Sequence, residues 1–339
     1  MNDAYLRAAV VGFGYWGPNL ARNFSASTDF RITGICDADP ARLKQAAAIY
    51  PSAIATESLD ELLAARPDLV AIAIPVASHY DVARRCLEGG CHVLVEKPFT
   101  STAREAEKLL TLAEKVGRMV FVDHTFLFTG AVEEMKRQID SGSLGDLLYI
   151  DSVRINLGLF QPDVDVIWDL APHDLSILQY LLGRAPTTVS AMGTSHNPRG
   201  TVDVAYLHLE YGDGLTAHLH LSWLSPVKLR RMIFAGTRQS LIFDDLDQDA
   251  KIKLYDQGVA FDVADLKSRR QVLVSYRKGD MRAPAIKPNE AIAEEFSEIA
   301  SVLRGGTVAR ATGYDGLISI RTLEAAIRSL HDSGRPAGL

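Results

Sequence analysis

The first third of the chain alternates short apolar runs with longer stretches whose apolar residues recur at helical spacing. Short runs that are apolar throughout are typical of strands buried on both faces of a parallel sheet. The predicted strands are Ala8–Val11, Ile32–Cys36, Leu69–Ile74, His92–Val95 and Met119–Val122. The predicted helices are Pro18–Ser27, Pro40–Tyr50, Ser58–Ala65, His79–Glu88 and Thr102–Val116. This alternation predicts a doubly wound α/β domain, with a parallel sheet and helices on both of its faces.

Beyond Gly142 apolar and polar positions alternate, which is typical of half-buried antiparallel strands. If Gly212-Asp213-Gly214 forms a hairpin loop, Leu207 lies opposite Leu219 and Leu209 opposite Ala217, so the apolar faces agree. Further predicted strands are Leu229–Ala235, Ser240–Phe243, Lys251–Tyr255 and Gln271–Tyr276. Predicted helices are Val166–Leu182, Asn289–Leu303 and Tyr314–His331. A second domain with a mostly antiparallel sheet is therefore expected.

The length of the chain predicts two domains, and its charge argues against nucleic acid as a partner. The 339 residues exceed the roughly 250 to 300 at which a single hydrophobic core stops growing. The formal net charge is −6 and no run of basic residues occurs, so the chain lacks the positive patch that nucleic-acid binding requires. We therefore expect no nucleic-acid partner.

The three cysteines, Cys36, Cys86 and Cys91, form neither a disulfide framework nor a zinc-site spacing. Residues 1–7 hold no apolar stretch of signal-peptide length, and no window approaches the ~18 consecutive apolar residues of a membrane span. These features predict a cytoplasmic protein with no membrane partner.

A glycine-rich motif follows the first predicted strand: Gly12-Phe13-Gly14-Tyr15-Trp16-Gly17, with Pro18 at the start of the next helix. Between a strand and a helix, this G-x-G-x-x-G pattern predicts binding of a dinucleotide pyrophosphate. Asp37 lies 20 residues beyond Gly17, where a carboxylate accepts hydrogen bonds from ribose hydroxyls and repels a 2′-phosphate. NAD is thus favoured over NADP. The alternative is that Asp37 only opens a turn and caps the next helix, while Arg42 serves a phosphate.

Two further polar groups are candidates for catalysis. Lys97, in Glu96-Lys97-Pro98, ends a predicted strand at the ligand-binding edge of the sheet, although a plain surface lysine is the alternative. Asp169 and His173 are spaced i, i+4 and share a face if they lie on one helix. Pro172 requires that this helix either starts near residue 172 or bends there. The alternative is that Asp169 caps the helix and His173 is a satisfied buried histidine.

The glycine motif, the acidic residue, Glu-Lys-Pro and Asp-x-x-x-His occur in the order that resembles the Gfo/Idh/MocA family of NAD(P)-dependent oxidoreductases. The resemblance implies a dinucleotide-binding Rossmann domain over 1–124. It also implies a substrate-binding and oligomerisation α/β domain over 125–339, with a large open, mostly antiparallel sheet. The family's Thr-Pro-x-x-x-His segment matches residues 74–79 with isoleucine in place of threonine, which assigns Pro75 and His79 to the cofactor site.

The same resemblance implies a mechanism. His173 takes the proton from a sugar hydroxyl while hydride passes to the nicotinamide, Lys97 holds that oxygen, and Asp169 orients the pair. Histidine suits this task because its ordinary pKa lies near neutrality. The expected cofactor residues are Gly12, Phe13, Gly14, Tyr15, Trp16, Gly17, Asp37, Pro75, His79, Glu96, Lys97 and His124. An exposed histidine at the end of a strand is the alternative for His124.

The segment 149–165 leads into the Asp169 helix and is expected to shape the substrate pocket, with Arg154 and Asn156 as substrate residues. Arg154 either pairs with a uronate or phosphate or stands on an open strand. Together with residues 14–19, this segment resembles bacterial nucleotide-sugar 3-dehydrogenases of the UDP-N-acetylglucosaminuronate type. The expected substrate is therefore a sugar or nucleotide sugar in polysaccharide biosynthesis.

Other functions stay open at this point. An NAD-dependent glycosidase or a non-catalytic NAD-binding regulator would share the same scaffold. The hairpin register sets His208 opposite His218 with His220 nearby, which raises the alternative of a metal site, although no metal is predicted because no carboxylate partner is evident. We instead expect the open sheet face to join copies of the chain into a homodimer or homotetramer. That face carries Val204, Tyr206, Thr216, His218, His220 and Ser222.

Overall fold

The computed structural model describes residues 5–158, 160, 164–261, 274–277, 279–306 and 310–339. The chain forms two compact units, of which the first comprises residues 1–129 and 289–324 and the second residues 130–288 and 325–339. The first unit thus includes a late segment of the chain as well as the glycine motif. The functional division at residue 124 into a cofactor domain and a substrate domain stays a prediction.

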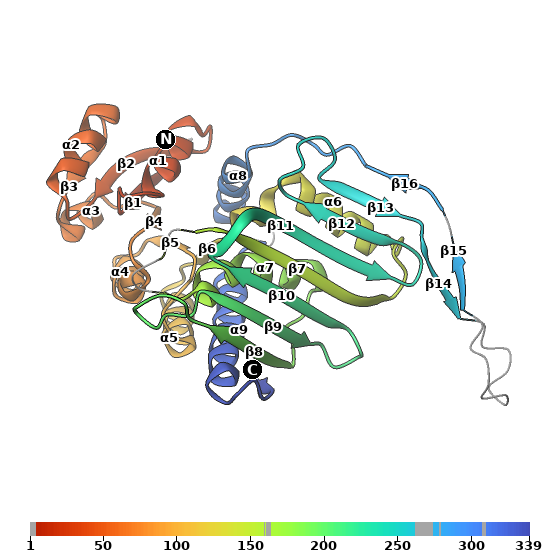
Figure 1. Cartoon of the computed structure of the whole chain (residues 1–339). Helices are drawn as coiled ribbons and strands as arrows, with labels where there is room; N and C mark the ends of the chain where they lie inside the picture. Colours follow the sequence, from red (N-terminus) through yellow and green to blue (C-terminus); the bar gives the residue numbers. More distant parts are fainter. Residues whose placement is uncertain (1–4, 159, 161–163, 262–273, 278, 307–309) are drawn as a thin grey trace. The chain divides into compact units, whose positions relative to one another are not determined.

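A parallel sheet of six strands organises the first unit, in the order β3-β2-β1-β4-β5-β6 (Figure 1). Its strands are β1 (Leu6–Val11), β2 (Phe30–Cys36), β3 (Ile54–Thr56), β4 (Leu69–Ile72), β5 (His92–Glu96) and β6 (Val120–Asp123). This is the strand order of a dinucleotide-binding Rossmann sheet, and the predicted fold class is confirmed. The pattern of apolar residues did not predict β3, because it is three residues long and two of them are exposed.

The helices between these strands begin and end close to the predicted residues. They are α1 (Gly17–Ala26), α2 (Pro40–Ile49), α3 (Leu59–Ala64), α4 (His79–Glu88) and α5 (Ala103–Val116), with short 3-10 turns at Val76–Ser78 (η1) and Thr125–Phe128 (η2). The side chain of Asp39 accepts the Ala41 N–H at 2.8 Å and so caps α2. Gly117 ends α5 in the left-handed conformation that a side chain would disfavour.

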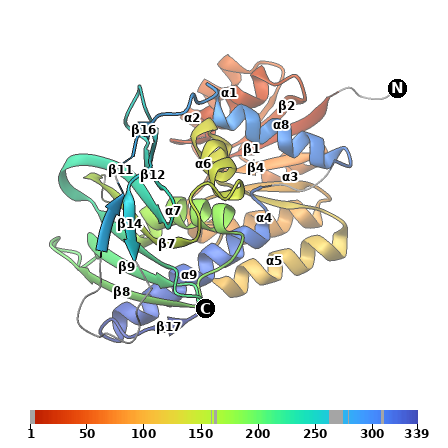
Figure 2. The same cartoon turned by 90° about the vertical axis from the view of Figure 1, so that its right-hand side faces the viewer.

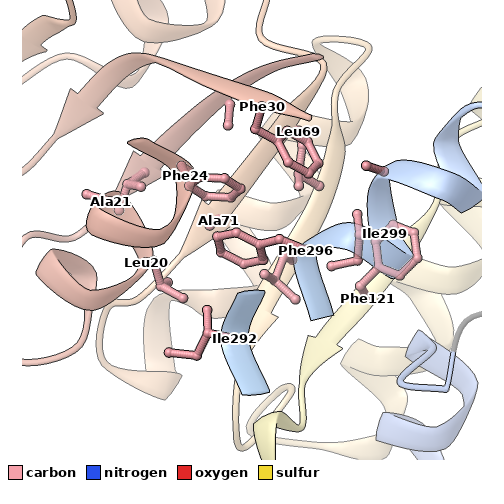
Figure 3. Packing of buried hydrophobic residues seen from close by; sticks show 14 of the residues in the cluster. Leu20, Ala21, Phe24, Phe30, Leu69, Ala71, Phe121, Ile292, Phe296 and Ile299 are labelled. Carbon is pink, nitrogen blue, oxygen red and sulfur yellow. The ribbon is translucent and has the colours of Figure 1, made fainter. Parts of the chain in front are cut away.

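Helix α8 (Ala291–Leu303) completes the core of this unit (Figure 3). The rings of Phe24 on α1 and Phe296 on α8 stack with their centroids 4.0 Å apart. Ile292 and Ile299 of α8 belong to the same buried cluster, which also includes Leu69 of β4. Because residues so distant in the sequence share one core, α8 is held firmly against the Rossmann sheet.

The second unit contains a sheet of nine strands in the order β16-β13-β12-β11-β7-β10-β9-β8-β17. These are β7 (Leu147–Leu157), β8 (Thr188–Thr194), β9 (Val204–Glu210), β10 (Thr216–Ser222), β11 (Leu224–Gly236), β12 (Ser240–Asp244), β13 (Ile252–Tyr255), β16 (Met281–Arg282) and β17 (Ala337–Gly338). Only the pairing of β7 with β10 is parallel among these described strands. β14 (Gly258–Phe261) and β15 (Val274–Arg277) form a separate pair, and residues 271–273 of the predicted strand Gln271–Tyr276 lie outside the described residues.

The predicted hairpin register is confirmed. Leu207 pairs with Leu219, and Leu209 pairs with Ala217, across β9 and β10. All four side chains are buried. Agreement between the apolar faces of the two strands therefore predicted the pairing correctly.

Helices α6 (Gly130–Asp140) and α7 (Val166–Leu182) lie on one side of this sheet (Figure 2). Helix α9 (Gly313–His331) belongs to the first unit up to Glu324 and to the second unit from Ala325 onward. Among the described residues, no helix covers the other face of the sheet. That face exposes the side chains of Met192 and Tyr206. Separately, no described helix is both long and apolar enough to cross a membrane.

Candidate active site

The three glycines of the motif have different structural roles. Gly12 has a φ of +94°, and a Cβ there would lie 2.2 Å from the carbonyl oxygen of Ala73. A Cβ on Gly17 would lie 1.9 Å from the carbonyl oxygen of Gly12. At Gly14, by contrast, the nearest atom to such a Cβ is Nη1 of Arg42 at 3.4 Å. Gly12 and Gly17 thus permit a tight turn and close packing, while Gly14 leaves room for a pyrophosphate above the start of α1.

Asp37 links the end of β2 to the glycine motif. Its Oδ2 accepts the N–H of Phe13 at 2.5 Å, and its Oδ1 accepts the N–H of Asp39 at 2.8 Å. Asp39 and not Asp37 caps α2, so the alternative in which Asp37 is the helix cap is wrong. A carboxylate has about four acceptor positions, which leaves Asp37 able to accept ribose hydroxyls. Arg42 lies beside it, with Nη1 3.6 Å from Oδ2.

These features fit a dinucleotide, since the open side of Gly14, the N-terminus of α1 and the acceptor Asp37 match pyrophosphate and ribose in chemistry. Two other residues of the glycine motif differ in their exposure. Tyr15 is 92% exposed, whereas Phe13 is buried and packs edge-on against Tyr50.

His79 braces the loops at the edge of the sheet beside Lys97. Its Nε2 lies 2.8 Å from the carbonyl oxygen of Ile74, and its Nδ1 lies 3.0 Å from that of Pro98. The side chain is buried. His79 therefore connects the turn that contains Pro75 to the chain directly after Lys97, and contact of Pro75 or His79 with the cofactor stays a prediction.

Glu96 and His124 end the neighbouring strands β5 and β6. Glu96 accepts the backbone N–H of Lys97 at 2.9 Å through Oε2. His124 is 3% exposed, so the alternative of an exposed strand-end histidine is wrong. Neither of its ring nitrogens has a hydrogen-bond partner among the described residues. Burial lowers the pKa of His124 to about 4, so the ring is neutral at pH 7.

Asp169 and His173 lie on one continuous helix. Asp165 caps α7 by accepting the N–H of Trp168 at 2.9 Å, and the helix continues through Pro172. The alternatives in which the helix starts near residue 172, or is capped by Asp169, are therefore wrong. Asp169 and His173 are both partly exposed, and their i, i+4 spacing puts them on one face.

Trp223, at the end of the β9–β10 hairpin, contacts Asp169. Its indole Nε1–H donates to Oδ2 of Asp169 at 3.0 Å. A Cβ on Gly158 would lie 2.6 Å from the indole ring, and the ring of Phe160 lies 5.3 Å from it. In the sequence Trp223 is one more apolar strand residue, so nothing pointed to this role. The predicted loop 157–164 is only partly described, because residues 159 and 161–163 lie outside the described residues.

Arg154 does not stand on an open strand. Its Nε and Nη2 lie 2.8 and 2.6 Å from Oδ1 of Asp174, and both side chains are buried. Ser152 donates to the other oxygen of Asp174 at 2.9 Å. Strand alternation puts Asn156 on the same face of β7. The ion pair ties β7 to the residue that follows His173, and a contact of Arg154 or Asn156 with substrate stays a prediction.

The histidines of the hairpin form an aromatic group. His208 pairs with His218 across the strands, and the ring of Tyr206 stacks on that of His220 with centroids 4.5 Å apart. Within the described part of the chain, no group of three His, Cys, Asp or Glu residues could hold a metal ion. Stacked rings on an open sheet face are therefore what this cluster presents.

Two parts of the chain match known protein families. Residues 6–124 match the family described as "Oxidoreductase family, NAD-binding Rossmann fold", and residues 132–242 match the "GFO/IDH/MocA C-terminal domain". The chain belongs to the Gfo/Idh/MocA family of oxidoreductases. Its Rossmann domain is an NAD-binding domain. The resemblance on which the sequence-based prediction relied is thereby confirmed.

Relatives of this Gfo/Idh/MocA protein are named dehydrogenases. The chain is 28% identical to UDP-N-acetylglucosamine 3-dehydrogenase of Acidithiobacillus ferrooxidans, over 96% of each protein. It is 25% identical to the NADP-dependent scyllo-inositol 2-dehydrogenase IolW of Bacillus subtilis, over 96% of this chain and 93% of that protein. The Bordetella pertussis WlbA dehydrogenase, solved with NADH and UDP-GlcNAcA, shares the fold with a TM-score of 0.79 at 18% identity, over 99% of each chain.

Proposed function

We propose that this oxidoreductase uses NAD to oxidise a secondary hydroxyl of a sugar, and that the sugar is carried on a nucleotide. The reaction class is supported most directly by Asp169 and His173, which share one face of α7, with Asp169 held by Trp223. The substrate class is supported by the similarity to a UDP-N-acetylglucosamine 3-dehydrogenase along nearly the whole of both chains. In this role the enzyme would supply an oxidised nucleotide sugar for polysaccharide biosynthesis.

Two residues act directly on the substrate oxygen and its proton, and two others position them. His173 accepts the proton of the hydroxyl that is oxidised, and Lys97 donates a hydrogen bond to the same oxygen as negative charge develops on it. Asp169 orients the imidazole, and the indole N–H of Trp223 fixes the Asp169 carboxylate. Bound NAD supplies the hydride acceptor.

The chain's own groups also account for cofactor binding. The backbone of residues 12–17 and the N-terminus of α1 would hold the pyrophosphate, and Asp37 would accept the ribose hydroxyls. A neutral His124 has two ring nitrogens without partners among the described residues and so offers one donor and one acceptor. We assign it to the nicotinamide side of the site, with Glu96.

We further propose that the uncovered face of the nine-stranded sheet joins two copies of the chain. Met192 is 64% exposed and Tyr206 44% exposed on this face, beside the stacked histidine. Burying such apolar side chains against a second copy would remove them from water. Light scattering at micromolar protein should give at least twice the 37.0 kDa chain mass. A monomer mass that added NAD does not change would contradict this assignment.

The substrate test is a panel of nucleotide sugars, free sugars and inositols incubated with purified protein and NAD. Formation of NADH in proportion to oxidised product, highest with a nucleotide sugar, is the expected result. If an alcohol is released while NAD is only catalytic, the protein is a glycosidase. If inositols are oxidised and nucleotide sugars are not, the proposed substrate class is wrong.

The residue assignments are tested with Lys97→Ala and His173→Ala. Each should lower kcat by about 10²- to 10⁴-fold, the usual cost of losing a positioned acid or base, while the Kd for NAD stays close to that of the unmodified protein. Lys108→Ala, on the exposed side of α5, is the matched control and should leave kcat unchanged. A variant at position 97 or 173 that keeps most of its activity removes that residue from the mechanism.

A further inference from the structure

Three acidic side chains of the first unit, Glu96, Asp123 and Glu295, lie close enough to influence one another electrostatically. Glu96 ends β5, Asp123 ends β6, and Glu295 projects from α8. Asp123 is 3% exposed and Glu295 is completely buried. Neither carboxyl oxygen of Glu295 has an N–H or O–H donor among the described residues. A buried carboxyl in this situation requires an explanation, because leaving it charged and unpaired is very costly.

Asp123 accepts three of the hydrogen bonds donated to this cluster. The indole Nε1–H of Trp16 donates to its Oδ2 at 2.8 Å. The backbone N–H of Thr125 donates to Oδ1 at 3.2 Å, and the Thr125 hydroxyl donates to the same oxygen. Asp123 thus accepts hydrogen bonds at both of its carboxyl oxygens. A second carboxyl beside it can form a hydrogen bond only if it carries a proton.

The groups with the strongest electrostatic influence on Glu295 are all acidic: Asp123, Glu96 and Glu298. Glu298 is on the same helix and is paired with Arg310 at 2.7 Å. Burial and Asp123 raise the pKa of Glu96 as well, and Lys97 only partly opposes this. The buried His124 beside Asp123 is neutral at pH 7. Burial, reinforced by Asp123 and Glu96, therefore raises the pKa of Glu295 well above its ordinary value.

We propose that Glu295 is a positioning residue for the cofactor site: its protonated carboxyl donates a hydrogen bond to Asp123, which in turn holds the indole of Trp16 and with it the glycine loop. Trp16 is the fifth residue of the G-x-G-x-x-G motif and directly precedes α1. The contact thus connects the pyrophosphate-binding loop to a helix that begins more than 250 residues later in the sequence.

The packing of α8 fixes the position of Glu295 relative to Asp123. Phe296, next to Glu295, stacks on Phe24 of α1 (Figure 3), and Trp16 packs against the same buried cluster. A helix fixed by a well-packed core holds its polar side chains in one place as well. The aromatic core and the buried acid therefore act on the same loop.

The proposal has a pH signature. A carboxyl whose pKa is raised in the folded state contributes stability that is fully present below its unfolded pKa and is lost as pH rises through the folded pKa. Affinity for NAD should fall over the same alkaline range, because an ionised Glu295 repels Asp123 and frees the Trp16 loop. Glutamine at position 295 still donates an N–H but cannot ionise, so it should keep the loop in place at every pH.

The experiment compares Glu295→Gln, Glu295→Leu and the control Glu294→Gln on the same helix. NAD titrations are followed by calorimetry from neutral to alkaline pH. Glu295→Gln should bind NAD about as tightly as the unmodified protein but without its alkaline loss. Glu295→Leu should bind roughly tenfold more weakly, the loss expected for one hydrogen bond to a charged group. Glu294→Gln should follow the unmodified protein throughout.

Two measurements keep the result clear if Glu295→Leu folds poorly. The infrared band of a protonated carboxyl should be present at pH 7 and weaker in Glu295→Gln. Trp16→Phe, which lacks the indole N–H, should weaken NAD binding and make a further change at Glu295 have little effect. The proposal is overturned if the infrared band is the same in both proteins, if glutamine and leucine have equal effects, or if the effects at positions 16 and 295 are simply additive.

Discussion

The two units bury acidic side chains in opposite ways. In the second unit Asp174 is completely enclosed but is balanced by the guanidinium of Arg154 and by the Ser152 hydroxyl. In the first unit Glu295 is equally enclosed, and its strongest electrostatic neighbours are acids. One carboxyl is compensated by an opposite charge and the other by a proton. The difference shows that burial alone does not indicate the charge state of a carboxyl, since its partners decide it.

Both arrangements lie directly beside residues with proposed roles. Asp174 follows His173 on α7, and Asp123 precedes His124 at the end of β6. An ion pair needs no proton to persist, whereas a protonated cluster depends on pH. We therefore expect the stability of the second unit to depend mainly on the Arg154–Asp174 pair. The stability of the first unit should depend on pH as well.

The largest effect should come from breaking the ion pair. Asp174→Ala leaves the Arg154 guanidinium buried without its partner and should lower the free energy of unfolding by about 3–5 kcal/mol. Denaturant unfolding measures this loss. The double variant Arg154→Met, Asp174→Leu removes both charges and should be much closer to the unmodified protein. Equal losses in the single and double variants would mean that the pair is not the source of the effect.

Acid should destabilise the first unit next most strongly. The pKa of His124 is about 4 in the folded chain against an ordinary 6.5, so the unfolded chain takes up the proton first as pH falls. The stability contributed by neutral His124 is present above pH 6.5 and is lost towards pH 4, by roughly 3 kcal/mol. His124→Gln cannot titrate and should reduce this acid loss in thermal unfolding. An unchanged pH profile would show that His124 does not cause it.

A smaller effect is expected for cofactor choice at Asp37, whose buried charge is met by two backbone N–H groups. Asp37→Ser removes the charge that repels a 2′-phosphate and leaves Arg42 nearby, so the NADP to NAD preference should rise about tenfold or more. Adding a further arginine close by should increase it. Asp39→Ser, which keeps a side chain able to cap α2, is the control. Unmodified protein that already prefers NADP would contradict the assignment.

The smallest effect is expected at Trp223. Trp223→Phe keeps an aromatic ring but removes the N–H that holds Asp169, so kcat should fall about tenfold, the value of roughly one hydrogen bond to a charged group. The Kd for NAD should not change, because Trp223 lies outside residues 6–124, which match the NAD-binding Rossmann family. Steady-state kinetics and NAD titration together test this. Unchanged kcat would remove Trp223 from the mechanism.

Much of the fold was predictable because its determinants are local. The apolar runs of the first unit predicted five of its strands, and the hairpin register followed from two apolar faces that had to agree. The spacing of Asp37 from Gly17 predicted a carboxylate beside the glycine motif, and in the structure Asp37 accepts the N–H of Phe13 in that motif. In α7 the predicted range Val166–Leu182 is the observed one, with Pro172 inside it. What the sequence left open there was only whether the helix began or bent at the proline.

The sequence by itself therefore determined the class of most elements of the first unit, the register of the β9–β10 hairpin, and the order of the motifs that mark a Gfo/Idh/MocA oxidoreductase. Only the tertiary structure decided which distant polar groups meet: Trp223 with Asp169, Arg154 with Asp174, and Glu295 with Asp123. The physical reason is that residue spacing sets backbone hydrogen bonds and the faces of helices and strands, which depend on near neighbours. The partner of a buried charge is set by how whole elements pack, and no local pattern records it.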